Sequence, residues 1–164
     1  MKDSLKIVVV SHSYIVDLNR ERLRILSELE PHIEVAIVVP KRWRPGGVMA
    51  DVVEPKFYQG GNLRVLPLPN FSEENQGLLC FGWRYVQFLR SFRPDVVLVE
   101  QGAKSLALAQ SILIQQIFKL KTKICCFTWW NLPYPLKFPV SWLEGYNLRY
   151  TRSEEHTSEL QSPY

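Results

Sequence analysis

The chain has 164 residues, of which 46% are hydrophobic and 22% are charged, and it carries a formal net charge of +4. This composition excludes a disordered segment, which buries too little apolar surface, and a fibrous protein, which is repetitive. A chain of this length buries roughly 70% of the surface that it exposes when unfolded, so one domain can form a core without disulfides or a structural metal.

Short runs of β-branched residues alternate with amphipathic segments along the chain. Continuous apolar runs predict buried strands, and apolar residues spaced three and four apart predict helices. In chain order we expect a strand at Lys6–Val10, a helix at Asn19–Glu30, a strand at Glu34–Val39, an irregular stretch at Lys41–Asn62, a short strand at Leu63–Leu68, a helix at Leu78–Phe92, a strand at Asp95–Glu100, a helix at Ala103–Leu120, a strand at Lys123–Thr128 and a helix in Trp142–Thr151. This alternation predicts an α/β, Rossmann-like fold with an open, mostly parallel, doubly wound sheet.

The last residues break the amphipathic pattern. Residues 152–162 read RSEEHTSELQS, which resembles the in-frame translation of a widely used sequencing adapter. We therefore expect residues 1–151 to form the native domain and residues 152–164 to be a non-native tail, with an acidic helix or a disordered tail as the alternative. On this interpretation the natural protein continues beyond Thr151. Its native part is more basic than the whole chain, because the tail holds three Glu and one Arg.

The apolar and cysteine-containing segments predict a cytoplasmic protein. The longest apolar stretch, Leu106–Ile117, is interrupted by glutamines and falls short of the about 20 residues that a membrane span needs. The run Ile7–Val10 is too short for a signal peptide. Cys80 stands alone, and Cys125 and Cys126 have no second pair at zinc or redox spacing, so we expect reduced, buried thiols and no metal.

The residues that follow the predicted strands form the candidate site, because open α/β sheets bind ligands beyond the carboxyl ends of their strands. The candidates for substrate binding are His12, Tyr14, Arg42, Glu100, Gln101, Trp130 and Asn131. Carboxylate and amide groups beside aromatic faces suit a hydroxyl-rich ligand such as a sugar.

Each group of candidates also has a purely structural interpretation. His12 can lock its own loop, and Glu100 can form a salt bridge instead of acting as a base or binding a hydroxyl. Trp130 and its neighbour Trp129 can be core packing. The segment Lys41–Arg44 can bind phosphate, contact the inner face of an anionic membrane through its cations and its Trp, or be a solvated loop.

Other ligand classes lack support in the sequence. Nucleic-acid binding requires a longer basic face with interleaved aromatics or a known reader module, and the chain has neither. The glycine pairs that begin at Gly46 and Gly60 do not lie between a strand and a helix, as a dinucleotide or P-loop motif requires. NAD and ATP are therefore not expected.

Several segments together resemble the N-terminal domain of family 4 glycosyltransferases, which have the GT-B fold. They are KIVVVSHSY, NRERLRILSEL, EVAIVVPKRWRPGG, FRPDVVLVEQG, FTWWN and WLEGYNLRYT. The resemblance covers about Leu5–Thr151. It implies an acceptor-side domain, a missing C-terminal domain that holds a nucleotide-sugar donor, and transfer of the sugar to a hydroxyl of a small-molecule or glycan acceptor without a metal.

Two positions depart from the pattern of that family. The loop SHSYIVDLN lacks the Gly-Gly turn that many members carry near the donor phosphates, and Trp130 stands where some members have a functional His. The resemblance therefore assigns no catalytic residue, and we expect the fragment alone to be inactive. A stand-alone flavodoxin-like binding or regulatory module is the alternative, because the same sheet occurs at single-domain length.

Overall fold

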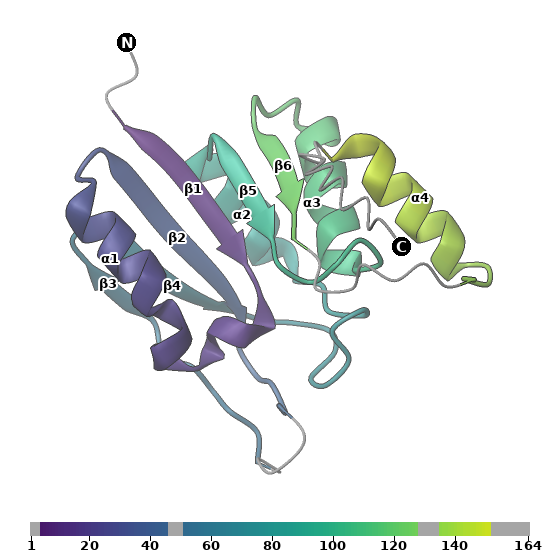
Figure 1. Cartoon of the computed structure of the whole chain (residues 1–164), viewed down its shortest axis with the longest axis horizontal. Helices are drawn as coiled ribbons and strands as arrows, with labels where there is room; N and C mark the ends of the chain where they lie inside the picture. The colour runs from purple at the N-terminus through teal and green to yellow at the C-terminus, as the bar shows by residue number, and fades with distance from the viewer. Residues whose placement is uncertain (1–3, 46–50, 128–134, 152–164) are drawn as a thin grey trace, which may run out of the picture.

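A six-stranded sheet with helices on both faces forms the body of the protein (Figure 1). The computed structural model describes residues 4–45, 51–127 and 135–151. The strands are β1 Leu5–Val10, β2 Ile33–Pro40, β3 Tyr58–Gly60, β4 Leu63–Leu68, β5 Val96–Val99 and β6 Lys123–Cys126, in the order β3-β4-β2-β1-β5-β6. All neighbouring pairs are parallel except β3 and β4. The α/β, Rossmann-like, doubly wound fold predicted from the sequence is confirmed.

The helices lie on opposite faces of the sheet because the connections run in opposite directions along it. The helices are α1 Glu21–Leu29, α2 Trp83–Phe92, α3 Leu106–Ile117 and α4 Val140–Tyr150, and two short 3₁₀ turns, His12–Ile15 and Asp17–Arg20, precede α1. Right-handed crossovers place α1 on one face and α2 and α3 on the other (Figure 1). Helix α4 packs beside α3. No described helix is long and apolar enough to cross a membrane.

The core consists mainly of the β-branched residues of the two central strands. Val8, Val9 and Val10 of β1 are at most 1% exposed, and all of β2 from Val35 to Val39 is similarly buried. Strands covered on both faces need apolar side chains on both, which explains why continuous apolar runs predicted them. The three cysteines are free, as expected, but half-buried rather than fully buried.

The connection between β2 and β4 contains no described helix, so the alternation of strands and helices is broken there. Pro40, Pro45 and Pro55 lie along it, and proline removes the backbone donor that a helix interior needs. The predicted irregular stretch ends in a strand that the sequence analysis missed, β3. A tight turn at Gly61, whose φ is 53°, folds β3 back onto β4.

Three helices begin later than predicted because side chains hold the preceding backbone in other conformations. The expected helix at Asn19–Glu30 starts at Glu21, since Arg20 turns inward and donates to the carbonyls of Tyr14 and Ile15. The expected helix at Leu78–Phe92 starts at Trp83.

Further along, Gln110 fixes the backbone that precedes α2 by bonding both the N–H and the C=O of Phe81. Helix α3 begins at Leu106 rather than Ala103 because the Ser105 hydroxyl caps it at the N–H of Leu108.

Candidate functional site

The switch point of the sheet lies between β1 and β5. From β1 the chain crosses to β2 on one side, and it returns from β4 to β5 on the other side, so the connections diverge at this pair of strands. Val10 of β1 and Val99 of β5 are register partners, which brings the residues after them to the same edge. Crevices at such points are where open α/β sheets bind ligands.

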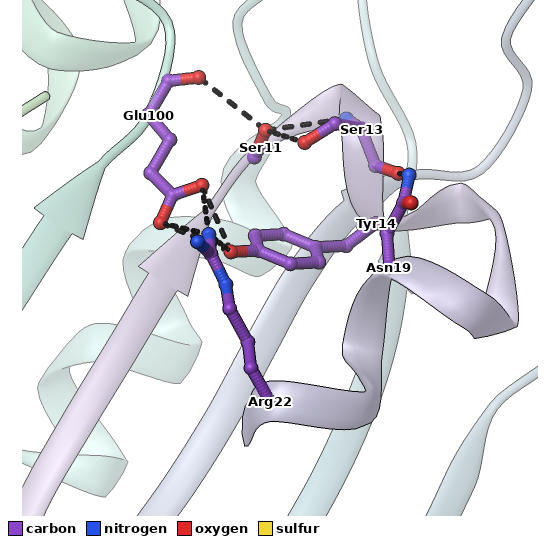
Figure 2. Close-up of polar contacts among 6 residues, drawn as sticks. All are labelled: Ser11, Ser13, Tyr14, Asn19, Arg22 and Glu100. Atoms are coloured by element: carbon purple, nitrogen blue, oxygen red, sulfur yellow. Dashed lines mark hydrogen bonds and ion pairs between the residues drawn. The ribbon is translucent and has the colours of Figure 1, made fainter. Parts of the chain in front are cut away.

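Serine side chains shape the loop that leaves β1. The Ser11 hydroxyl accepts from the N–H of Ser13 at 3.2 Å, lies 2.7 Å from the Ser13 hydroxyl, and donates to the Glu100 carbonyl at 3.3 Å. Asn19 donates to the Ser13 carbonyl at 2.6 Å. These bonds turn the chain into a 3₁₀ conformation directly after the strand and attach the β1 exit to the β5 exit (Figure 2).

Tyr14 and Glu100, two of the predicted site residues, meet at this edge. The Tyr14 hydroxyl donates to the Glu100 carboxylate, with oxygen–oxygen distances of 3.0 and 2.8 Å, and the Arg22 guanidinium reaches the same carboxylate oxygens at 2.8 and 2.9 Å. Arg22 also contacts the Tyr14 hydroxyl oxygen. Figure 2 shows the three polar groups converging from the β1 exit, the β5 exit and α1. The carboxylate is therefore fixed in place by two donors.

Burial and hydrogen bonding together set the protonation states of Tyr14 and Arg22. Tyr14 is only 1% exposed, and loss of solvation raises the pKa of its hydroxyl to about 12, so it stays a hydrogen-bond donor at neutral pH. The hydrogen bond to Tyr14 raises the pKa of Arg22, which stays cationic although its side chain is 61% exposed. A neutral phenol and a cation thus both face Glu100.

The raised pKa of Tyr14 predicts a loss of stability at high pH. A tyrosine has a pKa near 10 when unfolded, so its protonated form stabilises the fold fully below pH 10, and this contribution disappears as the pH rises from 10 to about 12. Between pH 8 and pH 11, we expect the free energy of unfolding of the wild type to fall by about 1 kcal/mol more than that of Tyr14→Phe. Chemical denaturation at pH 8, 10 and 11 measures the difference.

Other titrating groups cancel in that comparison. Burial also raises the pKa of Tyr85, Cys80 and Cys126, but both proteins keep these residues. Parallel pH profiles for the wild type and Tyr14→Phe would contradict the prediction.

His12 and Gln101 have buried polar atoms without partners. They lie two residues beyond the register partners Val10 and Val99, at the same edge of the sheet. Among the described residues, His12 Nδ1 and both side-chain polar atoms of Gln101 are buried and make no hydrogen bond. Burial also lowers the pKa of His12, so its imidazole is neutral at pH 7. Unpaired buried polar groups are costly, and native structures hold few of them.

A hollow of about 450 Å³ adjoins His12. Its lining residues are His12, Trp43, Pro45, Glu74, Asn75 and Gln76. The His12 and Trp43 rings lie against each other, with centroids 4.9 Å apart, so Trp43 fixes the imidazole at the wall. Three polar residues of the β4–α2 connection form the opposite part of the lining.

Arg42 lies beyond β2 at the same end of the sheet, but its guanidinium is engaged elsewhere. It faces Glu54 at 3.5 Å and Glu73 at 3.3 Å, and the neighbouring Arg44 faces Glu74 at 3.7 Å. Trp43 is 3% exposed and belongs to the core. Its burial removes the aromatic part of the membrane contact that the sequence suggested, because an interfacial Trp must reach the surface.

The remaining predicted residues cannot be placed in the site. Trp130 and Asn131 lie outside the described residues. Arg22, in contrast, was missed by the sequence analysis. It stands in the charged run Arg20–Arg24, and nothing in its spacing distinguishes it from solvent-facing neighbours. Within the described part of the chain, no three His, Cys, Asp or Glu side chains gather as a metal site.

Comparisons of the chain with protein-family models, with curated proteins and with solved structures find no match. A function for the chain is therefore inferred from the resemblance of its sequence segments together with the geometry and chemistry of the site.

Proposed function

We propose that the edge formed by the exits of β1 and β5 binds a hydroxyl-rich acceptor, and that the chain is the acceptor-side domain of a GT-B glycosyltransferase. The reaction is transfer of a sugar from a nucleotide sugar to an acceptor hydroxyl. The family resemblance of the sequence supplies the reaction class, and the structure supports it with a switch point of the sheet that carries neutral and charged hydrogen-bonding groups. In this proposal a second domain holds the donor.

The unpartnered polar atoms of His12 and Gln101 carry this proposal. Two polar atoms of Gln101 and one of His12 are buried at the same edge of the sheet as Glu100, so a ligand that offers both donors and acceptors would satisfy them. Hydroxyl groups both donate and accept hydrogen bonds. Glu100 is the acceptor of hydrogen bonds from Tyr14 and Arg22, and its fixed position orients a ligand hydroxyl at low entropic cost.

Saturation-transfer NMR of the full chain with methyl glycosides of glucose, mannose and N-acetylglucosamine tests the binding step. We expect at least one glycoside to receive saturation from the wild type. His12→Phe and Gln101→Leu should abolish the transfer while leaving the melting temperature unchanged or higher, because each removes buried polar atoms that have no partner. Binding loss combined with undiminished stability separates a ligand role from a structural one.

A matched control uses a glutamine far from the edge. Gln59 is exposed on β3, so Gln59→Leu should leave saturation transfer unchanged. Failure of all three glycosides to bind, or equal binding by wild type and Gln101→Leu, would contradict the proposal. A folded chain that binds none of them would favour the flavodoxin-like binding module instead.

A further inference from the structure

We propose a second binding site, for a compact polyphosphate, at the opposite end of the sheet from the candidate site. It lies between the α2–β5 and α3–β6 connections. Figure 1 shows where strands β5 and β6 begin, at the end of the sheet opposite to their arrow tips. The ligand is a small anion with two or more phosphoryl groups. The inference does not depend on the proposed glycosyl transfer, because no residue is shared between the two sites.

The two connections that line the cavity are hydrogen-bonded to each other. Its volume is about 990 Å³, and its lining comes from the end of α2, the segment that enters β5 and residues 118–122 after α3. The Thr122 hydroxyl donates to the Pro94 carbonyl at 2.7 Å, and the Lys123 N–H donates to the Asp95 carbonyl at 2.8 Å. The two connections are thereby held at a fixed separation, which lowers the entropic cost of binding.

Cations dominate the lining. Arg90, Arg93, Lys119 and Lys121 are all exposed there, and none of them forms an ion pair with a carboxylate among the residues that the structure describes. Asp95 is the one carboxylate of the lining, and it already accepts the backbone N–H of Lys6.

Nearby negative charge does not neutralise these cations. The carboxyl ends of α2 and α3 contribute about half a negative charge each, so with Asp95 about two negative charges face four positive ones. An excess of about two positive charges remains, and the four cations come from the end of α2 and from two connections around a cavity of about 990 Å³, so they can contact more than one phosphoryl group at once. Arg90 is also positioned by Phe118, whose ring centroid lies 4.5 Å from the guanidinium carbon.

Backbone strain supplies a second, independent observation. Among the described residues, Arg93 and Lys119 are the non-glycine residues with positive φ, at 50° and 49°, and both line this cavity. Each follows the end of a helix, where glycine is the usual residue in the left-handed conformation. Long cationic side chains therefore stand at two positions where the backbone favours glycine. Strained residues of this kind concentrate at functional sites.

Isothermal titration of the full chain with sodium tripolyphosphate tests the inference. We expect binding that weakens at higher ionic strength and exceeds the affinity for orthophosphate at least about tenfold. Arg93→Gly and Lys119→Gly should each weaken binding about tenfold, since each removes a charge-assisted contact. Both variants relieve left-handed strain, so their melting temperatures should equal or exceed that of the wild type, and a loss of binding cannot be attributed to unfolding.

Arg84→Gln is the matched control, because Arg84 is an exposed cation of α2 that does not line the cavity. It should bind tripolyphosphate as the wild type does. Absence of tripolyphosphate binding, or an equal loss in the control, would overturn the inference. Co-sedimentation with phosphatidylserine vesicles distinguishes the source of phosphate: vesicle binding without tripolyphosphate binding would place the ligand on a lipid surface and overturn the assignment to a free polyphosphate.

Discussion

Replacing Glu100 with leucine is expected to lower the free energy of unfolding by about 2–3 kcal/mol, one of the two largest effects of a single substitution that we predict. The substitution leaves the hydroxyl of Tyr14, a residue only 1% exposed, without the acceptor for its proton, and an unsatisfied buried donor costs about 1–3 kcal/mol. Arg22 contributes less, because its side chain is 61% exposed and regains water.

A double-mutant cycle assigns the loss to the correct pair. In a Tyr14→Phe background the hydroxyl is absent, so Glu100→Leu should cost less than about 1 kcal/mol, which corresponds to a coupling energy of about 1–2 kcal/mol. Glu100→Gln keeps an acceptor and should be milder in either background. Equilibrium denaturation followed by circular dichroism gives all four free energies. An equal cost of Glu100→Leu in both backgrounds would show that the phenol contributes nothing to holding the carboxylate.

The strands could be predicted from sequence because their determinants are local. Runs such as Ile33–Pro40 are apolar at consecutive positions, and only a strand covered on both faces requires that pattern. The start of α2 could not, because it depends on a contact that is distant in sequence. Helix α2 starts at Trp83 because the Gln110 side chain forms hydrogen bonds with the backbone of Phe81, 29 residues away in the sequence. Strand β3 was missed because three residues carry no usable periodicity.

The sequence predicts which residues follow the strands at the edge of the sheet, but it does not predict which of their side chains contact one another. Topology alone brings the residues that follow β1 and β5 to one edge, and the structure places both Tyr14 and Glu100 there. Their direct bond spans 86 residues and depends on side-chain conformations that the sequence does not encode locally. Arg22 was missed for the same reason. Trp43 was assigned to the surface because its neighbours are charged, whereas the structure buries it against His12.

Helix α4 should detach when Asn147 is replaced, because this side chain is its principal polar attachment to the body of the protein. Asn147 is 0% exposed, and its amide nitrogen donates to the carbonyls of Ala103 at 2.7 Å and Ser105 at 3.1 Å. Much of the remaining helix surface faces solvent, including Trp142, which is 64% exposed. Apolar burial therefore offers little compensation once the amide is lost.

Asn147→Asp is expected to lower the free energy of unfolding by about 3 kcal/mol or more, since a buried carboxylate would replace the donor and face two carbonyl oxygens. Asn147→Ala, which removes the same bonds without adding charge, should cost about 2 kcal/mol. Hydrogen exchange should rise first in residues 140–150, because the loss acts locally before it acts globally. Gln116→Ala provides the comparison: it removes the exposed 3.3 Å bond from Tyr146 of α4 to Gln116 of α3 and should cost less than about 0.5 kcal/mol. If exchange in α4 were unchanged in Asn147→Asp, packing against α3 rather than the Asn147 amide would hold the helix.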